Sequence, residues 1–175
     1  MSYTRYPESS NQLTFYYQKS NIFNLVHVRT MYRAKMMLND QKESMVDDYG
    51  MSSDEDDAFK IFIEDAVNDV LQIVLKMTYG VSDALVLNDS VAISSHTSVS
   101  NCYGVKVADE ESFNENNLFS VDDGIKKYIQ YHILASWYAL TGLTDEEAKW
   151  SFKKDLARQD LITNRLFQLR KRQLT

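Results

Sequence analysis

The stretch that decides the fold is "DEDDAFKIFIEDAVNDVLQIVL", residues 54–75, because it carries a complete signal for an amphipathic helix. Ser52 precedes it and Glu55 follows at the third position, which predicts a capping box in which each side chain bonds the other's backbone amide. The four acids at 54–57 then fill the first turn, where the positive end of the helix dipole stabilises negative charge. Beyond them, spacings typical of one helix face predict a buried stripe of Phe59, Phe62, Ile63, Ala66, Val67, Val70, Leu71, Val74 and Leu75.

The same run of acids raises the alternative of a cation site. Calcium loops need spaced oxygen ligands, a glycine in mid-loop and a distal bidentate glutamate. Here the carboxylates are contiguous and would point around a helix, so the sequence favours a helix start over a metal site. Their second use as an exposed negative surface stays open.

Two further helices are predicted, over residues 21–38 and residues 125–140. Residues 21–38 favour a helix because Met, Ala, Lys and Arg dominate their second half, although "LVHVR" alone fits a strand. Residues 125–140, "IKKYIQYHILASWYAL", are apolar or aromatic on nearly all faces after Tyr128. A helix of this kind is a central one that its neighbours cover. Gly142 is expected to end it.

A long terminal helix is predicted from about Asp145 to Arg172. Thr144 and Glu147 form a second capping-box pattern at its start. At 1.5 Å per residue the helix would be about 40 Å long, more than is needed to close the core, so its end is expected to reach beyond it. Its apolar face is expected to comprise Ala148, Phe152, Leu156, Ile162, Leu166 and Leu169.

The remaining segments predict a small amount of sheet. Residues 1–20 are expected to be an irregular, extended N-terminal arm with a short edge strand at "LTFYY". Within a β-rich insertion at about 81–120, "ALVL" and "VAISS" flank a turn at Asn88-Asp89 and predict a hairpin, with "CYGVKVA" as a third strand. The predicted fold is therefore mainly α: a bundle of three to four helices with a β-hairpin or small sheet, forming one domain over 21–175.

Composition sets limits on the class of protein. The chain has 175 residues, of which 44% are hydrophobic and 25% charged, as in an ordinary globular domain. Its one cysteine, Cys102, excludes an internal disulfide framework, favours a reducing compartment and is expected to be an inert thiol. No apolar stretch is long enough to span a bilayer, and the N-terminal residues lack the layout of a secretion signal.

Charge is unevenly distributed along the chain. Residues 1–144 hold 11 Lys and Arg against 20 Asp and Glu, whereas residues 145–175 hold 8 against 5, within a net charge of −6. An acidic body argues against general nucleic-acid binding, which normally needs a basic face. The uneven distribution is compatible with subunits that pair head to tail through opposite charge.

The sequence contains no recognisable catalytic motif. His27, His96 and His132 have no metal-binding spacing, and no glycine-rich loop that could cradle phosphates is present. We therefore predict no catalytic residue, no metal ligand and no cofactor. His132 is expected to be a core or interface residue. An enzyme with a site assembled from scattered residues, such as His132 with Tyr128 or Asp65, remains as an alternative.

Two groups of residues are candidates for contact with other subunits. Trp137, Tyr138 and Trp150 form an aromatic cluster with Phe152, interpreted first as the core of a helical hairpin and alternatively as a subunit interface. The second group lies in the basic tail. Its cations suit a helix C-terminus, and alternatively a docking site for an acidic partner or for DNA phosphates. This group comprises Arg165, Arg170, Lys171 and Arg172.

The layout of residues 52–172 resembles the head-to-tail connector, or adaptor, proteins of tailed bacteriophages. The resemblance rests on the acid-capped helix, the β-rich insertion and the buried helix that ends in "ASWYALTG" before a charged long helix. Crass-like phages of the gut, whose tails carry stacked ring proteins, are one source that it suggests. It implies a structural virion protein, made in the host cytoplasm, that forms a twelvefold ring between portal and tail. That ring would extend the DNA channel without sequence-specific DNA binding, catalysis, cofactors or membrane contact.

In such a ring, an acidic channel wall would avoid holding the moving DNA, because each contact of Lys or Arg with a phosphate adds holding energy. The candidates for this wall are Asp54, Glu55, Asp56, Asp57, Glu64, Asp65 and Asp69. The alternative function is a helical regulatory module that binds a partner protein through its C-terminal helix.

Overall fold

The computed structural model describes residues 2–5, 12–38, 43, 45–75, 83–87, 91–94, 97–99, 101–108 and 118–162. Its helices are α1 (Lys19–Met36), the short α2 (Val46–Tyr49), a 3-10 turn η1 (Ser53–Glu55) that leads into α3 (Asp56–Leu75), α4 (Leu118–Leu140) and α5 (Thr144–Asp160). Its strands are β1 (Ser2–Arg5), β2 (Gln12–Gln18), β3 (Asp83–Leu87), β4 (Val91–Ser94), β5 (Thr97–Val99) and β6 (Cys102–Ala108). The predicted mainly α fold, a helical bundle with a small sheet, is confirmed.

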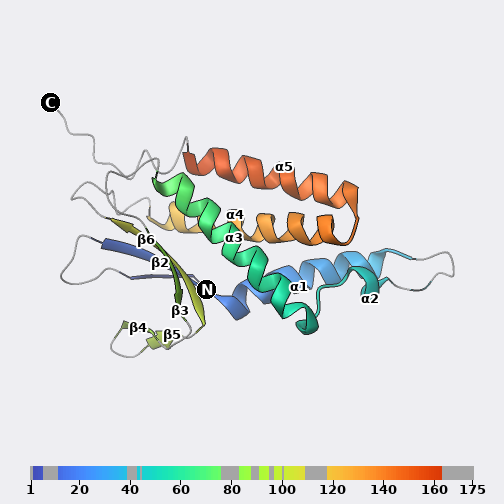
Figure 1. Cartoon of the computed structure of the whole chain (residues 1–175), viewed down its shortest axis with the longest axis horizontal. Helices are drawn as coiled ribbons and strands as arrows, with labels where there is room; N and C mark the ends of the chain where they lie inside the picture. The colour runs from blue at the N-terminus through green and yellow to red at the C-terminus, as the bar shows by residue number, and fades with distance from the viewer. Residues whose placement is uncertain are drawn as a thin grey trace.

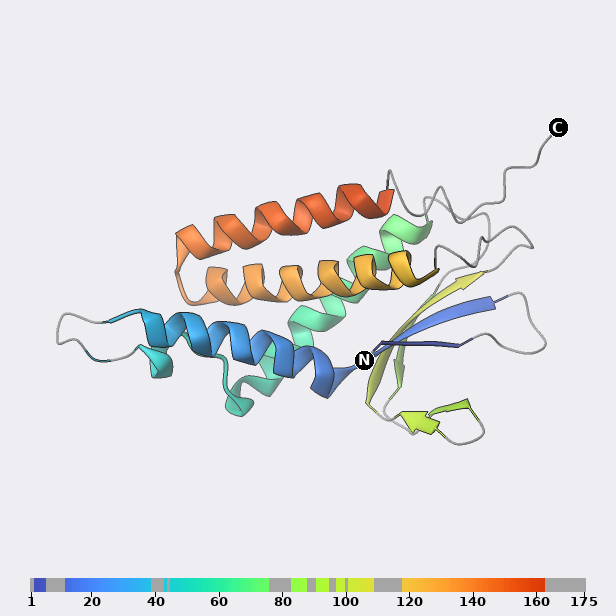
Figure 2. The ribbon, with the colours of Figure 1, turned by 180° about the vertical axis from the view of Figure 1, so that it is seen from behind.

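Helix α4 is the centre of the bundle, as its sequence predicts. It packs against α5 across the turn at Gly142, against α3, and against α1. Figure 1 shows α3 crossing in front of α4, and Figure 2, from behind, shows α1 in front with α5 above. Gly142 adopts a left-handed φ of 75°, a conformation that glycine takes without the penalty of a Cβ atom.

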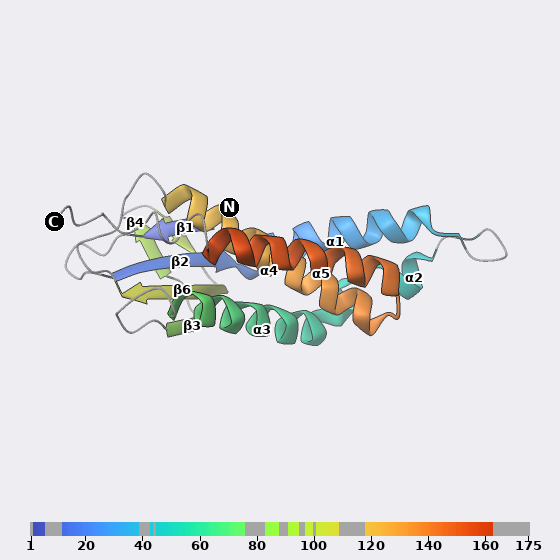
Figure 3. The same ribbon diagram turned by 90° about the horizontal axis from the view of Figure 1, so that it is seen from above.

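The main sheet has four antiparallel strands in the order β1-β2-β6-β3. It lies at the end of the bundle where α1 begins (Figure 3). The expectation that residues 1–20 form an irregular arm with an edge strand at "LTFYY" is wrong. This segment forms β2, which is an inner strand of the sheet. Phe15 opposes Val105, and Tyr17 opposes Tyr103. All four side chains are buried, so pairing with β6 lets β2 bury one face against the helices.

The predicted hairpin of "ALVL" with "VAISS" does not form. Strand β3 pairs with β6, and β4 pairs with β5 in a separate two-stranded sheet. Pairing with β6 places β3 at the edge of the four-stranded sheet, where it also contacts α3. The predicted turn at Asn88-Asp89 lies outside the described residues. The third strand, "CYGVKVA", is confirmed as β6 and lies inside the sheet.

The core joins the sheet to all the long helices. Helix α1 contributes Ile22, Val26, Thr30 and Ala34 at four-residue spacing. Most of the predicted stripe of α3 is confirmed: Phe59, Ile63, Ala66, Val67 and Val70 are buried, and Phe62 packs against them. Leu71, also predicted, is only half-buried, and Ile73, which was not predicted, is buried. Several large side chains of α4 are fully enclosed, namely Ile125, Ile129, Ile133, Leu134 and Tyr138.

Helix α5 differs from its prediction in which face it buries. Glu146, Trp150 and Ala157 face the bundle, and Leu161 follows on the same side, whereas Phe152 and Leu156 are exposed. The small side chain of Ala157 and the flat ring of Trp150, which tilts against Tyr131, let α5 lie close to α4. The predicted capping box at Thr144 is also wrong, because the N-cap is Leu143 and makes no side-chain bond.

The predicted extension of the terminal helix to Arg172 lies partly outside the described residues, which end at residue 162. Of the apolar face expected there, Ile162 is half-buried and packs against the core, and Ala148 is exposed. Leu166 and Leu169 are not among the described residues. Within the described part of the chain, no helix is both long and apolar enough to cross a membrane.

Candidate functional site

The acidic start of α3 is built as its sequence predicts. The backbone N–H of Ser52 donates to Oε2 of Glu55 at 2.6 Å, and the hydroxyl of Ser52 bonds the same carboxylate. The N–H of Asp54 in turn donates to the Ser52 hydroxyl at 3.2 Å. This capping box satisfies N–H groups that a helix start leaves without partners, so the predicted structural role of Ser52 and Glu55 is confirmed.

The carboxylates proposed for a channel wall fall into two groups. Asp54, Asp56, Asp57, Asp65 and Asp69 are exposed, whereas Glu55 and Glu64 are half-buried. Glu55 is held in the capping box, and Asp56 pairs with Lys19 at 2.7 Å. No group of three or more His, Cys, Asp or Glu residues that could hold a metal ion is present in the part of the chain that the structure describes.

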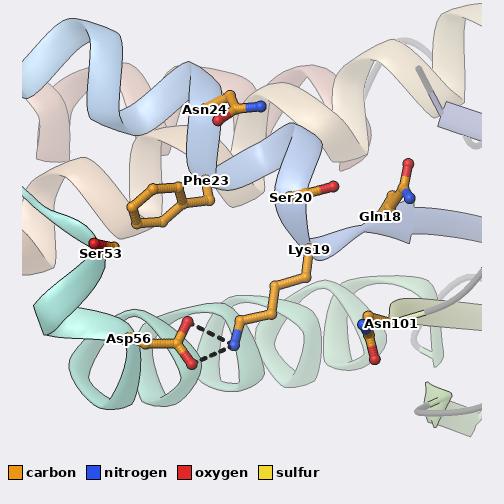
Figure 4. A pocket seen from close by; sticks show the side chains of 8 residues that line it. All are labelled: Gln18, Lys19, Ser20, Phe23, Asn24, Ser53, Asp56 and Asn101. Carbon is orange, nitrogen blue, oxygen red and sulfur yellow. Dashed lines mark hydrogen bonds and ion pairs between the residues drawn. The ribbon is translucent and has the colours of Figure 1, made fainter.

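A hollow of about 310 Å³ lies beside this helix start, between the beginning of α1 and η1 (Figure 4). The side chain of Lys19 reaches from α1 to Asp56 across it, and the backbone N–H of Lys19 donates to the carbonyl of Asn101 at 2.9 Å. The hydroxyls that line it belong to Ser20 and Ser53, and among the described residues no histidine lines it to activate them. The hollow therefore has the features of a structural junction between α1, α3 and the sheet.

A second group of titratable residues joins α3 to α4. The hydroxyl of Tyr128 donates to Oδ2 of Asp69 at 3.1 Å. Nδ1 of His132 lies 3.4 Å from the same oxygen, but the contact lacks hydrogen-bond geometry, and this buried nitrogen has no hydrogen-bond partner among the residues that the structure describes. Burial lowers the pKa of His132 and the charge of Lys154 lowers it further, against the opposing charges of Asp69 and Asp65.

His132 is therefore neutral near pH 7, and its contact with Asp69 is not an ion pair. Burial, together with Asp69, raises the pKa of Tyr128. A catalytic site would require these groups to face a cavity that admits a substrate. Neither the hollow of Figure 4 nor the groove described below is lined by Tyr128, His132 or Asp69. The side chains of Tyr128 and His132, which are both on α4, instead pack between α3 and α5.

The aromatic cluster belongs chiefly to the core of the chain, as its favoured interpretation predicts. Trp137 is buried and its Nε1 donates to the carbonyl of Tyr49 at 2.9 Å. Tyr138 is fully enclosed, and burial, with the charge of Glu146, raises its pKa to about 12. Trp150 lies at the margin of the core and donates from Nε1 to Glu146 at 3.2 Å. Phe152, predicted to join the cluster, points outward.

Sequence reasoning missed a cationic groove around Trp150. Arg29 and Arg33 of α1 and Lys149 and Lys153 of α5 line it, together with Tyr131 of α4. The sequence did contain one indication of it. Arg29 and Arg33 are four residues apart, as are Lys149 and Lys153, and this spacing places both members of each pair on one helix face. That α1 and α5 present these faces to the same groove follows only from the way they pack on α4. The predicted basic tail, with Arg165, Arg170, Lys171 and Arg172, lies outside the described residues.

Comparison of the chain with protein-family models, with curated proteins and with solved structures found no match.

Proposed function

We propose that this chain is a structural virion protein, a subunit of a head-to-tail connector ring that extends the DNA channel between portal and tail. The proposal begins from the resemblance of residues 52–172 to connector proteins of tailed phages. The observation that carries it is the separation of unlike surfaces on one small domain. The exposed acids belong to η1 and α3, whereas the cations of α1 and α5 line a groove in which no described residue of α3 takes part. Figure 1 shows α3 in front of α4, and Figure 2, from behind, shows α1 in front.

Two unlike surfaces are what a closed ring requires. In a ring each copy uses one surface to meet a different surface of its neighbour, so the two surfaces must be complementary and not self-complementary. Opposite charge supplies such complementarity and disfavours contacts between like surfaces. Matching the portal would make the ring twelvefold, with the portal protein and the next tail protein as its other partners.

The exposed carboxylates also suit a wall along which DNA passes. Asp54 of η1 and Asp57, Asp65 and Asp69 of α3 are exposed, and none of them is paired with a lysine or arginine in the ion pairs of the described residues. A negative wall repels phosphates, so the genome would slide without the salt-dependent grip of a basic surface. In this role the ring would bind DNA transiently and without regard to sequence.

A second candidate function is a helical module that binds a partner protein through α5. The exposure of Phe152 (65%) and Leu156 (47%), one turn apart on the outer face of that helix, favours it. A monomer or dimer that binds a regulatory partner would need the apolar face of α5. A ring subunit would instead need the acidic and cationic surfaces.

Size-exclusion chromatography with light scattering, on the chain alone and with the portal protein of the same particle, tests the proposal. We expect the chain to join the portal as a ring of several copies. A portal that never carries this chain, with the chain bound instead to a regulatory partner through Phe152, would favour the second candidate. Turnover of a small molecule by the purified chain would contradict both.

A further inference from the structure

The groove between α1 and α5 has a volume of about 450 Å³ and is also lined by Tyr131 and Tyr138 of α4. Tyr131 and Trp150 are tilted against each other within it, with ring centroids 5.6 Å apart. Three cations lie over these aromatic rings. Nζ of Lys153 is 4.3 Å, Nζ of Lys149 is 5.2 Å and the guanidinium carbon of Arg29 is 5.6 Å from the centroid of Trp150.

The groove has more positive charge than it neutralises internally. Glu146, the one carboxylate among the described residues that line it, accepts from Arg33 and from Lys149 at 2.8 Å each. Burial alone would raise the pKa of Glu146, but these two cations and the bond from Trp150 outweigh burial and lower it. Lys153 makes no ion pair with a described residue. Nη1 of Arg29 is buried and has no hydrogen-bond partner within the described part of the chain.

Helix α1 adds apolar side chains next to its two arginines. Val28, Tyr32 and Met36 follow one another at four-residue spacing and are 63%, 67% and 63% exposed. Val28 and Tyr32 line the groove itself. Apolar side chains flanked by cations are the arrangement that receives an amphipathic helix whose apolar residue is flanked by acids.

The chain carries such a helix surface on α3. Asp57, Ile61 and Asp65 are exposed at four-residue spacing, which places them on one line along the helix. We call these three residues the acidic line. Ile61 is 58% exposed and is the only large hydrophobic side chain of α3 with such exposure among the described residues. At 1.5 Å per residue the acidic line and the row from Val28 to Met36 are each about 12 Å long.

No described residue of α3 lines the groove, and Figures 1 and 2 show α3 and α1 in front in opposite views. A copy therefore cannot fill its own groove, and the fit is between copies. We propose that the groove between α1 and α5 receives the acidic line of a second copy, with Ile61 against Tyr32 and Trp150 and the two aspartates against Arg29 and Lys153. This inference rests on the proposed ring, for which it names the subunit contact. It assigns Asp57 and Asp65 to that contact, so the channel wall keeps the exposed acids Asp54 and Asp69.

Charge reversal on each surface tests the contact. One variant, Lys149→Glu with Lys153→Glu, reverses the groove; another, Asp57→Lys with Asp65→Lys, reverses the acidic line. Self-association of the full chain is followed by sedimentation velocity up to the highest soluble concentration. We expect wild-type chain to associate and each variant alone to associate at least about tenfold more weakly, because like charges then face each other. An equimolar mixture should regain association, since each reversed surface then finds its complement.

Two matched controls separate the contact from general effects. Asp155→Lys with Asp160→Lys makes the same change in net charge as the reversal of the acidic line, but at exposed positions of α5. This control should leave association unchanged. Phe152→Ser removes an exposed apolar side chain of another surface, and should have no effect where Ile61→Ser weakens association. Circular dichroism melting of every variant establishes that it is folded.

The outcomes distinguish this inference from the proposed function. If wild-type chain associates and the reversals change nothing, or if the mixture fails to regain association, the contact is elsewhere and only the inference is overturned. Chain that stays monomeric in every sample also overturns it, while the proposed ring is then judged by its assembly on the portal. If the groove reversal abolishes binding to the portal and leaves self-association intact, the groove belongs to the portal and the inference is wrong.

Discussion

The hydroxyl of Tyr17 donates to Oδ1 of Asp122 at 3.1 Å and thereby joins the sheet to the central helix. Tyr17 is at the end of β2, Asp122 is in the first turns of α4, and both are buried. Burial, with the charge and hydrogen bond of Asp122, raises the pKa of Tyr17 well above its usual value. The Tyr17 hydroxyl therefore keeps its proton at neutral pH, and its bond to Asp122 joins the sheet to the bundle.

Tyr17→Phe removes this donor from a buried carboxylate. We expect the free energy of unfolding to fall by about 1–3 kcal/mol, because a buried polar group that loses a partner retains its desolvation cost. Urea unfolding measures the change. Tyr32→Phe, at a side chain that is 67% exposed, is the control and should change stability by less than about 0.5 kcal/mol. Equal stability of Tyr17→Phe and wild type would show that the bond does not hold the sheet.

Gly50 is required where α2 meets α1. A Cβ atom there would clash with Sδ of Met31 and lie 2.7 Å from the carbonyl oxygen of Val46. Since the second neighbour is backbone, Gly50→Ala must displace α2, and we expect a loss of about 1–3 kcal/mol by thermal unfolding. Gly142→Ala is the comparison: nothing lies within 4 Å, and its cost of about 1 kcal/mol comes from the left-handed φ of 75°. A neutral Gly50→Ala would contradict the close packing of α2.

The capping box sets the stability of the start of α3. Ser52→Ala removes the hydroxyl that accepts from the N–H of Asp54 and should cost about 1 kcal/mol in the free energy of unfolding. Ser53→Ala, at an exposed neighbour, is the matched control. If the two variants are equally stable, the Ser52 hydroxyl contributes nothing beyond solvation. Neither change alters the exposed acids, so self-association should persist in both.

His132 gives the protein a dependence of stability on pH. Its pKa in the folded chain is below the ordinary value of 6.5, so the unfolded chain binds the proton first as the pH falls. The free energy of unfolding should therefore be full above pH 6.5 and decline as the pH falls from there toward the folded pKa. His132→Gln removes this part of the slope. Urea midpoints measured between pH 5 and 8 test it, and an identical slope in both proteins would contradict the buried, neutral state of His132.

The local features of the fold could be predicted from the sequence. The capping box of Ser52 and Glu55, the buried stripe of α3 and the central position of α4 depend on residues close together in the chain, where spacing determines what meets. The helix α1 was predicted for the same reason, within two residues of its start. The outward orientation of Phe152 was missed because the spacing of apolar residues in α5 fits two faces, and packing of Trp150 and Ala157 on α4 selects between them.

The sheet and the groove could not be predicted in this way. Tyr17 of β2 pairs with Tyr103 of β6, and nothing local to either strand specifies that partner. Likewise Arg29 and Trp150 meet because α1 and α5 both pack on α4, which brings side chains from distant segments over one ring. Both features arise from contacts between elements that are far apart in sequence.

The most direct test of the proposed function is an image of the particle that carries this chain, reconstructed at a resolution sufficient to count subunits. We predict a closed ring of this protein at the junction of portal and tail, with Asp54 and Asp69 toward the channel and the groove of each copy filled by the acidic line of its neighbour. A chain found elsewhere in the particle, present as single isolated copies, or absent from it would contradict the proposal.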